Sequence, residues 1–192
     1  MPLHDHFRPP LSEARPWDGF FSTWAVMIAG GLNKVLPPRF VALPLVSSRH
    51  LGAAHDAEGP AWTPDEPFFS GALDWSGRDL FEVRVVDEGR RLCAAVELAS
   101  PANKGRPSAR RLFVGRCVGH LRMGVGLVLA DILTTCPHDL HRQLLDTLEV
   151  EAPAIGGETL HAAAYRAERW ERAAIDVWVH PLRVGGPLPT MP

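Results

Sequence analysis

This sequence predicts an α/β fold in which helices flank a mixed β-sheet. Two β-type segments, Leu80–Val86 and Leu92–Ala99, are joined by a short Asp- and Gly-containing turn, as in a hairpin. A helical pattern follows, and then a nearly continuous apolar run, Val125–Leu133, of the kind that forms a strand covered on both faces. A helix between two such strands favours their parallel pairing, so we expect one mixed sheet with helices packed on it.

The segments before the hairpin read in order as an arm, a helix and a strand. Residues 1–16 contain four prolines and should form an arm or loop. From Trp17 to Val35 large apolar residues recur at three- and four-residue steps, which predicts a helix that Pro37-Pro38 ends. Phe40–Val46 is strand-like, and Pro44 within it indicates an edge strand or a bulge.

The remaining elements complete a single domain spanning residues 1–192. Residues 47–78 are rich in Pro, Gly, Asp and Ser and predict a long loop-rich excursion with at most one short strand. Apolar periodicity predicts two further helices and a second hairpin, whose expected ranges are 105–123, 138–149, 160–166 and 175–184.

Composition bounds the class of protein. The chain has 192 residues with 46% hydrophobic and 22% charged side chains, as in an ordinary globular domain. Its longest apolar runs are shorter than the roughly 20 residues of a membrane helix, so we expect no membrane association. The N-terminal residues lack the order of a signal peptide, and the three cysteines resemble reduced core residues. Both features favour a cytoplasmic protein.

Basic residues are concentrated in one part of the chain. The net charge of −2 argues against a protein that coats nucleic acid by charge alone. Between Leu98 and Ala130, however, there is no Asp or Glu, and Arg106, Arg110 and Arg111 open the helix predicted there. These arginines form either a solvated helix face or a phosphate-binding surface, and the sequence leaves both interpretations open.

The strongest site signal is Glu97, a carboxylate inside the otherwise apolar second strand of the hairpin. Burying an unpaired carboxylate is costly, so such a residue normally has a partner, a metal ion or a raised pKa. Asp131 stands near the end of the next predicted strand. If the two strands are parallel, both acids approach the same edge of the sheet and can share Mg²⁺ or Mn²⁺. Otherwise each caps a backbone group or pairs with an arginine.

Other candidates are weaker. Lys104 is either a helix-entry residue in water or an ammonium that orients a water and offsets developing negative charge. Asp56 alone would be an ordinary loop aspartate, and Glu82 is expected to face solvent or the same cleft as Glu97. His138 and His141 are three residues apart without a third ligand, which favours surface histidines.

Several segments resemble a known family. Residues 96–104, VELASPANK, resemble the E-x-x-S-P-x-N-K signature of a bacterial family of unknown function (family four-zero-five-eight). Further segments are similar to that family over nearly the whole chain: LNKVLPPRF at 32–40, VLAD at 128–131 and VGGPLPT at 184–190. The signature is also shared with restriction-endonuclease-like proteins of the PD-(D/E)XK superfamily.

This resemblance implies a PD-(D/E)XK-like core and a metal site made of an Asp, a Glu and a lysine. Glu97 would be the acid of the (D/E)XK strand, and Asp56 the aspartate upstream of it. The sequence departs from the pattern at His55, where the motif has proline, and at Ala99, where it has lysine. Lys104, from the following turn, would then supply the amine.

Two functions follow as expectations. The first is a metal-dependent nuclease, or phosphodiesterase, in which Asp56, Glu97 and Asp131 bind Mg²⁺ or Mn²⁺ and Lys104 assists the attacking water. In it, Arg106, Arg110 and Arg111 hold backbone phosphates. The second is a catalytically inactive module of the same fold that binds a protein or nucleic-acid partner, which the two departures favour. A homodimer is compatible with either function.

Overall fold

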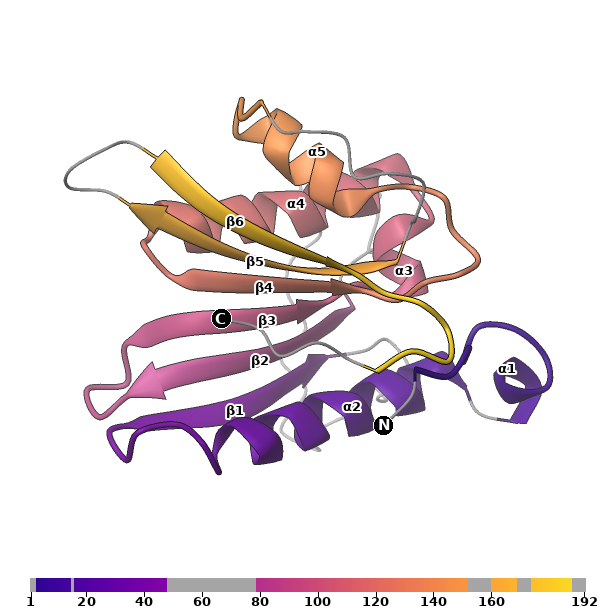
Figure 1. Ribbon diagram of the computed structural model, residues 1–192, viewed down its shortest axis with the longest axis horizontal. Coiled ribbons are helices and arrows are strands. Elements are labelled where there is room, and N and C mark those ends of the chain that lie inside the picture. The colour runs from indigo at the N-terminus through magenta and orange to yellow at the C-terminus, as the bar shows by residue number, and fades with distance from the viewer. Residues whose placement is uncertain (1–2, 15, 48–78, 152–159, 169–173, 188–192) are drawn as a thin grey trace, which may run out of the picture.

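A computed structural model of the chain describes residues 3–14, 16–47, 79–151, 160–168 and 174–187. Six strands, in the order β1-β2-β3-β4-β5-β6, form a single sheet in which each strand lies beside its neighbour in sequence (Figure 1). Only β3 and β4 are parallel, and the other pairs are antiparallel. The predicted mixed sheet with flanking helices is therefore confirmed. The strands are β1 (Phe40–Ser47), β2 (Leu80–Asp87), β3 (Leu92–Leu98), β4 (Gly126–Asp131), β5 (His161–Glu168) and β6 (Ala174–Pro181).

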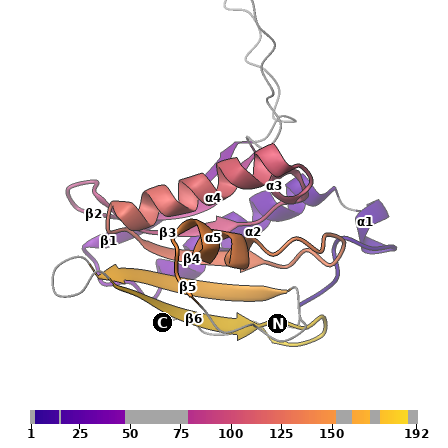
Figure 2. The ribbon, with the colours of Figure 1, turned by 90° about the horizontal axis from the view of Figure 1, so that it is seen from above.

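The described residues contain the three predicted helices and two short ones that were not predicted, at 11–14 within the expected arm and at 101–104. They are α1 (Leu11–Ala14), α2 (Trp17–Leu32), α3 (Pro101–Lys104), α4 (Pro107–Arg122) and α5 (Leu140–Thr147). Figure 2 shows α3 leading directly into α4, so that together they form the crossover between the parallel strands β3 and β4. α5 begins later than expected, because Asp139 caps its N-terminus by accepting a hydrogen bond from the Arg142 amide at 3.0 Å.

Each face of the sheet has its own apolar core. α2 packs on one face, where Phe21 and Ala25 meet Phe81, Val83 and Leu98 of the central strands. On the other face α4 and α5 pack against β4 and β5. The core on this face includes Ala95, Ala99, Phe113, Cys117, Leu127, Leu129 and Leu144. Because side chains alternate along a strand, this division fixes the face of every intervening residue.

Alternation places three acids on the face of α4. On β3, Glu97 lies between Ala95 and Ala99, which both face α4. On β2, Glu82 lies between two residues of the opposite core, and it is the direct cross-strand partner of Glu97. Asp131 follows Leu129 by two residues at the end of β4 and has the same orientation. The polar groups described below therefore converge beneath one helix.

β1 is the outer strand of the described sheet, as Pro44 predicted. Its free edge is occupied at Ala42, whose N–H donates to Asn33 Oδ1 at 2.7 Å and whose carbonyl accepts from Asn33 Nδ2 at 2.9 Å. Ala42 thus directs both backbone groups away from β2, and alternation gives Pro44, which has no N–H, the same orientation. This arrangement blocks the addition of another strand.

The N-terminal residues are more ordered than the predicted arm. Leu3 is buried, its N–H donates to the Gly186 carbonyl at 2.7 Å, and its carbonyl accepts from the Gly185 N–H at the same distance. These bonds attach the N-terminal segment to the turn after β6. No helix in the described ranges combines the length and the hydropathy needed to cross a membrane.

Candidate functional site

The S-P-x-N-K segment forms a tightly bonded turn between β3 and α4. Ser100 is the N-cap of α3: its hydroxyl accepts from the Asn103 amide, and the Asn103 side chain accepts from the Ser100 N–H at 3.1 Å. The Asn103 Nδ2 also donates to the carbonyl of Asp79, just before β2, at 3.1 Å. The segment therefore joins β2, β3 and α3 through a reciprocal cap, with Pro101 at the first helical position.

Lys104 completes this turn by pairing with Asp131. Its Nζ lies 2.7 Å from Asp131 Oδ2, and both side chains are fully buried. Burial raises the pKa of Asp131 from 3.8 to about 6, although the attraction of Lys104 acts in the opposite direction. At neutral pH the two residues form a buried ion pair that links α3 to the end of β4.

Glu97 is fully buried and is held by α4. Arg116 donates to both carboxylate oxygens, from Nε to Oε1 at 2.6 Å and from a terminal nitrogen to Oε2 at 2.8 Å. Burial by itself would raise the pKa of Glu97, but its close contacts with His120 and Arg116 outweigh burial and hold that pKa below its usual value. Glu97 is therefore an ionised carboxylate at neutral pH.

Glu82 and His120 complete a compact cluster with Glu97, which we call the Glu–Glu–His cluster. One ligand atom from each residue lies within 4.8 Å of the others. His120 Nε2 is 3.4 Å from Glu97 Oε1 and 3.7 Å from Glu82 Oε1. Glu82 Oε1 also accepts from Arg84 Nε at 2.8 Å. All three members are buried, and they come from three neighbouring elements, β2, β3 and α4.

Several polar atoms of this cluster make no hydrogen bond. They are Glu82 Oε2 and both ring nitrogens of His120. Buried polar atoms are nearly always bonded, so a group of such atoms on neighbouring side chains calls for an explanation such as an ion. Octahedral cation–oxygen bonds of about 2.1 Å put ligand atoms roughly 3 to 4 Å apart. To hold one divalent cation, the cluster therefore needs a small contraction and the release of at least one Glu97 oxygen from Arg116.

Among the described residues, the acids that the sequence predicted to share a metal ion do not come together in one cluster. Glu97 lies in the cluster, whereas the carboxylate of Asp131 accepts from Lys104, and Asp56 lies outside the described residues. Glu82, expected to face either solvent or the same cleft as Glu97, is fully buried beside Glu97.

The three arginines at the start of α4 differ in their surroundings. Arg110 donates to the Lys104 carbonyl at 2.8 Å, so it helps to hold the turn in place. Arg106 and Arg111 are exposed.

His120 and Arg116 were missed as site residues. Their signal is present in the sequence: they stand four apart on the helix that follows Glu97, and therefore lie on one face of it. The sequence does not show which way α4 is rotated about its axis, so it cannot tell that this face is directed at β2 and β3.

The prediction that His141 lies on the surface was wrong. His141, expected on the surface, is buried, and its Nδ1 lies 2.5 Å from the Tyr165 hydroxyl. Burial lowers the pKa of His141 and raises that of Tyr165, so a neutral ring is hydrogen-bonded to a neutral tyrosine. His138, by contrast, is exposed as expected.

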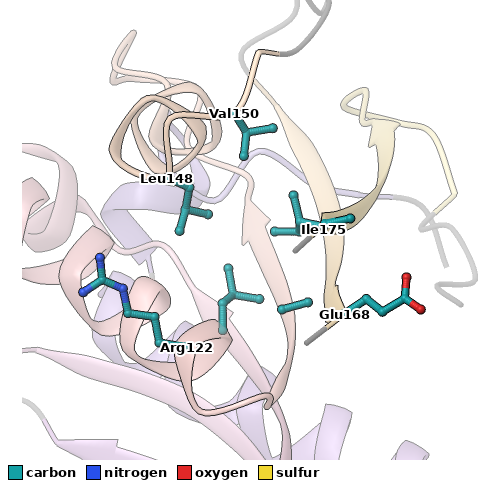
Figure 3. A pocket seen from close by; sticks show the side chains of 8 residues that line it. Arg122, Leu148, Val150, Glu168 and Ile175 are labelled. Carbon is teal, nitrogen blue, oxygen red and sulfur yellow. The ribbon is translucent and has the colours of Figure 1, made fainter. Parts of the chain in front are cut away.

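A groove on the described surface lies elsewhere. Its volume is about 640 Å³, and Figure 3 shows Leu148, Val150 and Ile175 along it, with Arg122 and Glu168 on opposite sides. No member of the Glu–Glu–His cluster lines it. An open apolar groove with two charged residues at its rim offers no set of groups for catalysis, so we place the candidate site at the cluster.

Comparison of the chain with protein-family models, curated proteins and solved structures found no match. The functional interpretation therefore depends on the geometry of this chain.

Proposed function

We propose that this protein is a metal-dependent phosphodiesterase of nuclease-like, PD-(D/E)XK-type architecture, with the Glu–Glu–His cluster as its metal site. One observation carries the proposal: neighbouring buried ligand groups on three elements converge within 4.8 Å while Glu82 Oε2 and both nitrogens of His120 make no hydrogen bond. The mixed sheet and the helical crossover between β3 and β4 agree with the core that the sequence resemblance implies.

The donor set favours Mn²⁺ over Mg²⁺. Two carboxylates suit either ion, but the imidazole of His120 is a poorer ligand for Mg²⁺, which prefers oxygen and keeps several waters. When bound, such a cation polarises a phosphodiester and lowers the pKa of an attacking water. Glu82 and Glu97 provide the negative charge that holds the cation, and α4 presents His120 to complete the ligand set.

Lys104 has a positioning role in this proposal. Its ammonium is engaged by Asp131, so its contribution is to fix α3 and the end of β4 around the cluster. The resemblance implied a different role, in which Lys104 assists the attacking water.

A second candidate function is supported by a specific observation. Arg116 neutralises Glu97 and Lys104 neutralises Asp131, so two of the expected metal-binding carboxylates already have a cationic partner. This arrangement is also that of an inactive module that keeps the fold and binds a nucleic acid or a protein.

Cleavage assays separate the two functions. Supercoiled plasmid DNA and a labelled RNA are incubated with the purified protein in MnCl₂, MgCl₂ or EDTA. We expect nicking with Mn²⁺, weaker nicking with Mg²⁺ and none with EDTA. Glu97→Gln and Glu82→Gln should each abolish it, while Glu88→Gln, an exposed acid in the turn of the same hairpin, should not. Equal cleavage by Glu97→Gln would overturn the phosphodiesterase proposal, and Mn²⁺ binding without cleavage would favour the inactive module.

A further inference from the structure

Arg116 links the Glu–Glu–His cluster to solvent. Its side chain is 25% exposed although it contacts a fully buried carboxylate, and its guanidinium lies 5.1 Å from the ring centre of Phe113. The pairing with Glu97 uses Nε and one terminal nitrogen. A guanidinium has five N–H donors, so three remain after these two bonds. Arg116 therefore has donors available at the solvent side of the site.

Charge balance indicates what the cluster requires once a cation is present. Glu82 and Glu97 contribute two negative charges, and their partners Arg84 and Arg116 contribute two positive charges. A histidine that binds a metal ion is neutral, so in the metal-bound state these four side-chain charges cancel. A divalent cation would leave an excess of two positive charges in a largely buried site, which is unfavourable unless an anion accompanies it.

Geometry indicates how that anion would be held. Both oxygens of Glu97 accept hydrogen bonds from Arg116, so a cation that binds Glu97 competes with at least one of those bonds. A guanidinium released from the carboxylate keeps its planar fork of donors, and this fork matches two oxygens of a phosphate. Arg84, whose side chain is 42% exposed, pairs with Glu82 at the other side of the cluster and can likewise exchange that carboxylate for a phosphate.

We propose that the site takes up a divalent cation and a phosphate group together, with Arg116 passing from the Glu97 carboxylate to the phosphate. This inference deepens the proposed function and rests on its metal site. It makes Arg116 the phosphate-binding residue, in place of Arg106, Arg110 and Arg111 at the start of α4. Coupled binding is reciprocal: phosphate tightens cation binding by the same factor by which the cation tightens phosphate binding.

Two measurements on the full chain test the coupling. Bound Mn²⁺ is followed by the loss of the free-ion electron paramagnetic resonance signal, with and without dimethyl phosphate. Phosphate proximity is followed by the ³¹P relaxation of dimethyl phosphate and of methyl phosphate, corrected for protein-free Mn²⁺. We expect Mn²⁺ affinity to rise about fivefold or more with the ester, and ³¹P relaxation to increase only when protein and Mn²⁺ are both present. Dimethyl phosphate reports on an internal phosphodiester and methyl phosphate on a terminal phosphate, and a response to either supports the proposal.

Variants assign the effect to Arg116. Arg116→Gln should bind Mn²⁺ at least as tightly as the wild type without phosphate, because a competitor for Glu97 is removed, and should lose the phosphate effect. Arg116→Lys keeps the charge without the fork and should lose most of the effect, which preserves the test if Arg116→Gln fails to fold. Arg166→Gln is the matched control, because Arg166 also pairs with a carboxylate, Asp176, and lies over an aromatic ring, that of Trp178. It should behave as the wild type.

The outcomes separate this inference from the function on which it rests. Absence of Mn²⁺ binding by the wild type would overturn both. Mn²⁺ binding that depends on Glu97 but leaves ³¹P relaxation unchanged would overturn the inference alone. Full coupling retained in Arg116→Gln and Arg116→Lys would also overturn it.

Discussion

Replacing Lys104 by methionine should show how strongly the buried ion pair supports this fold. Lys104 and Asp131 are both fully buried, and their charged atoms are 2.7 Å apart. Removing the ammonium leaves an unpaired buried carboxylate, which typically costs about 3–5 kcal/mol at neutral pH. The cost should be smaller at pH 5, because the pKa of Asp131 is already raised to about 6 and rises further without Lys104, so the carboxyl takes up a proton.

Urea denaturation at pH 7 and pH 5 measures this cost, and a double-mutant cycle isolates the pair. Lys104→Met combined with Asp131→Leu removes both charges, so the double variant should be more stable than Lys104→Met alone. Arg166→Met, at an exposed ion pair that also has an aspartate as its acid, should cost less than about 1 kcal/mol. A loss below about 1 kcal/mol for Lys104→Met at pH 7, or a double variant as unstable as the sum of its single changes, would refute this reasoning.

Three other predictions concern stability. The pKa of Asp131 is about 6 in the folded protein against an ordinary value of 3.8, so its contribution to stability is complete below about pH 4 and is lost as the pH rises through 6. This difference in pKa corresponds to about 3 kcal/mol of stability. As the pH rises from 4 to 7, the urea midpoint should therefore fall less steeply in Asp131→Asn than in the wild type. Parallel slopes would contradict the raised pKa of Asp131. Asn33→Ala removes two hydrogen bonds to Ala42 and should cost about 1–3 kcal/mol by the same assay. No loss in Asn33→Ala would show that the edge of β1 does not depend on this side chain. Asn103→Ala removes the bond to the Asp79 carbonyl as well as the cap on Ser100, so it should also lower the urea midpoint.

The fold was largely predictable because its local signals agree with one another. The β2–β3 hairpin has two apolar runs and a short turn, and α4 has a clear stripe of inward residues, so each element can be recognised without its neighbours. The parallel pairing of β3 and β4 follows from the helix between them. The attachment of Leu3 to the turn after β6 was not predictable, because it depends on backbone bonds between opposite ends of the chain.

The candidate site was only partly predictable. Glu97 could be recognised from its sequence alone, because a carboxylate in an apolar strand is unusual wherever the strand lies. Its partners could not, because the cross-strand position of Glu82 depends on the hairpin register, which includes a shift at Val85/Val86. The contact of His120 with Glu97 could be predicted only if the rotation of α4 about its axis were known. The pairing of Asp131 could be predicted only if Lys104 were known to be directed inward. Long-range geometry decides each of these contacts.

Anomalous diffraction from a crystal grown in MnCl₂ is the most direct test of the central claim that Glu82, Glu97 and His120 bind a divalent cation. We expect a manganese peak about 2.0–2.3 Å from oxygens of both carboxylates and from a nitrogen of His120, with Arg116 displaced from at least one oxygen of Glu97. A cluster without a peak, in which Arg116 still donates to both oxygens of Glu97, would contradict the account.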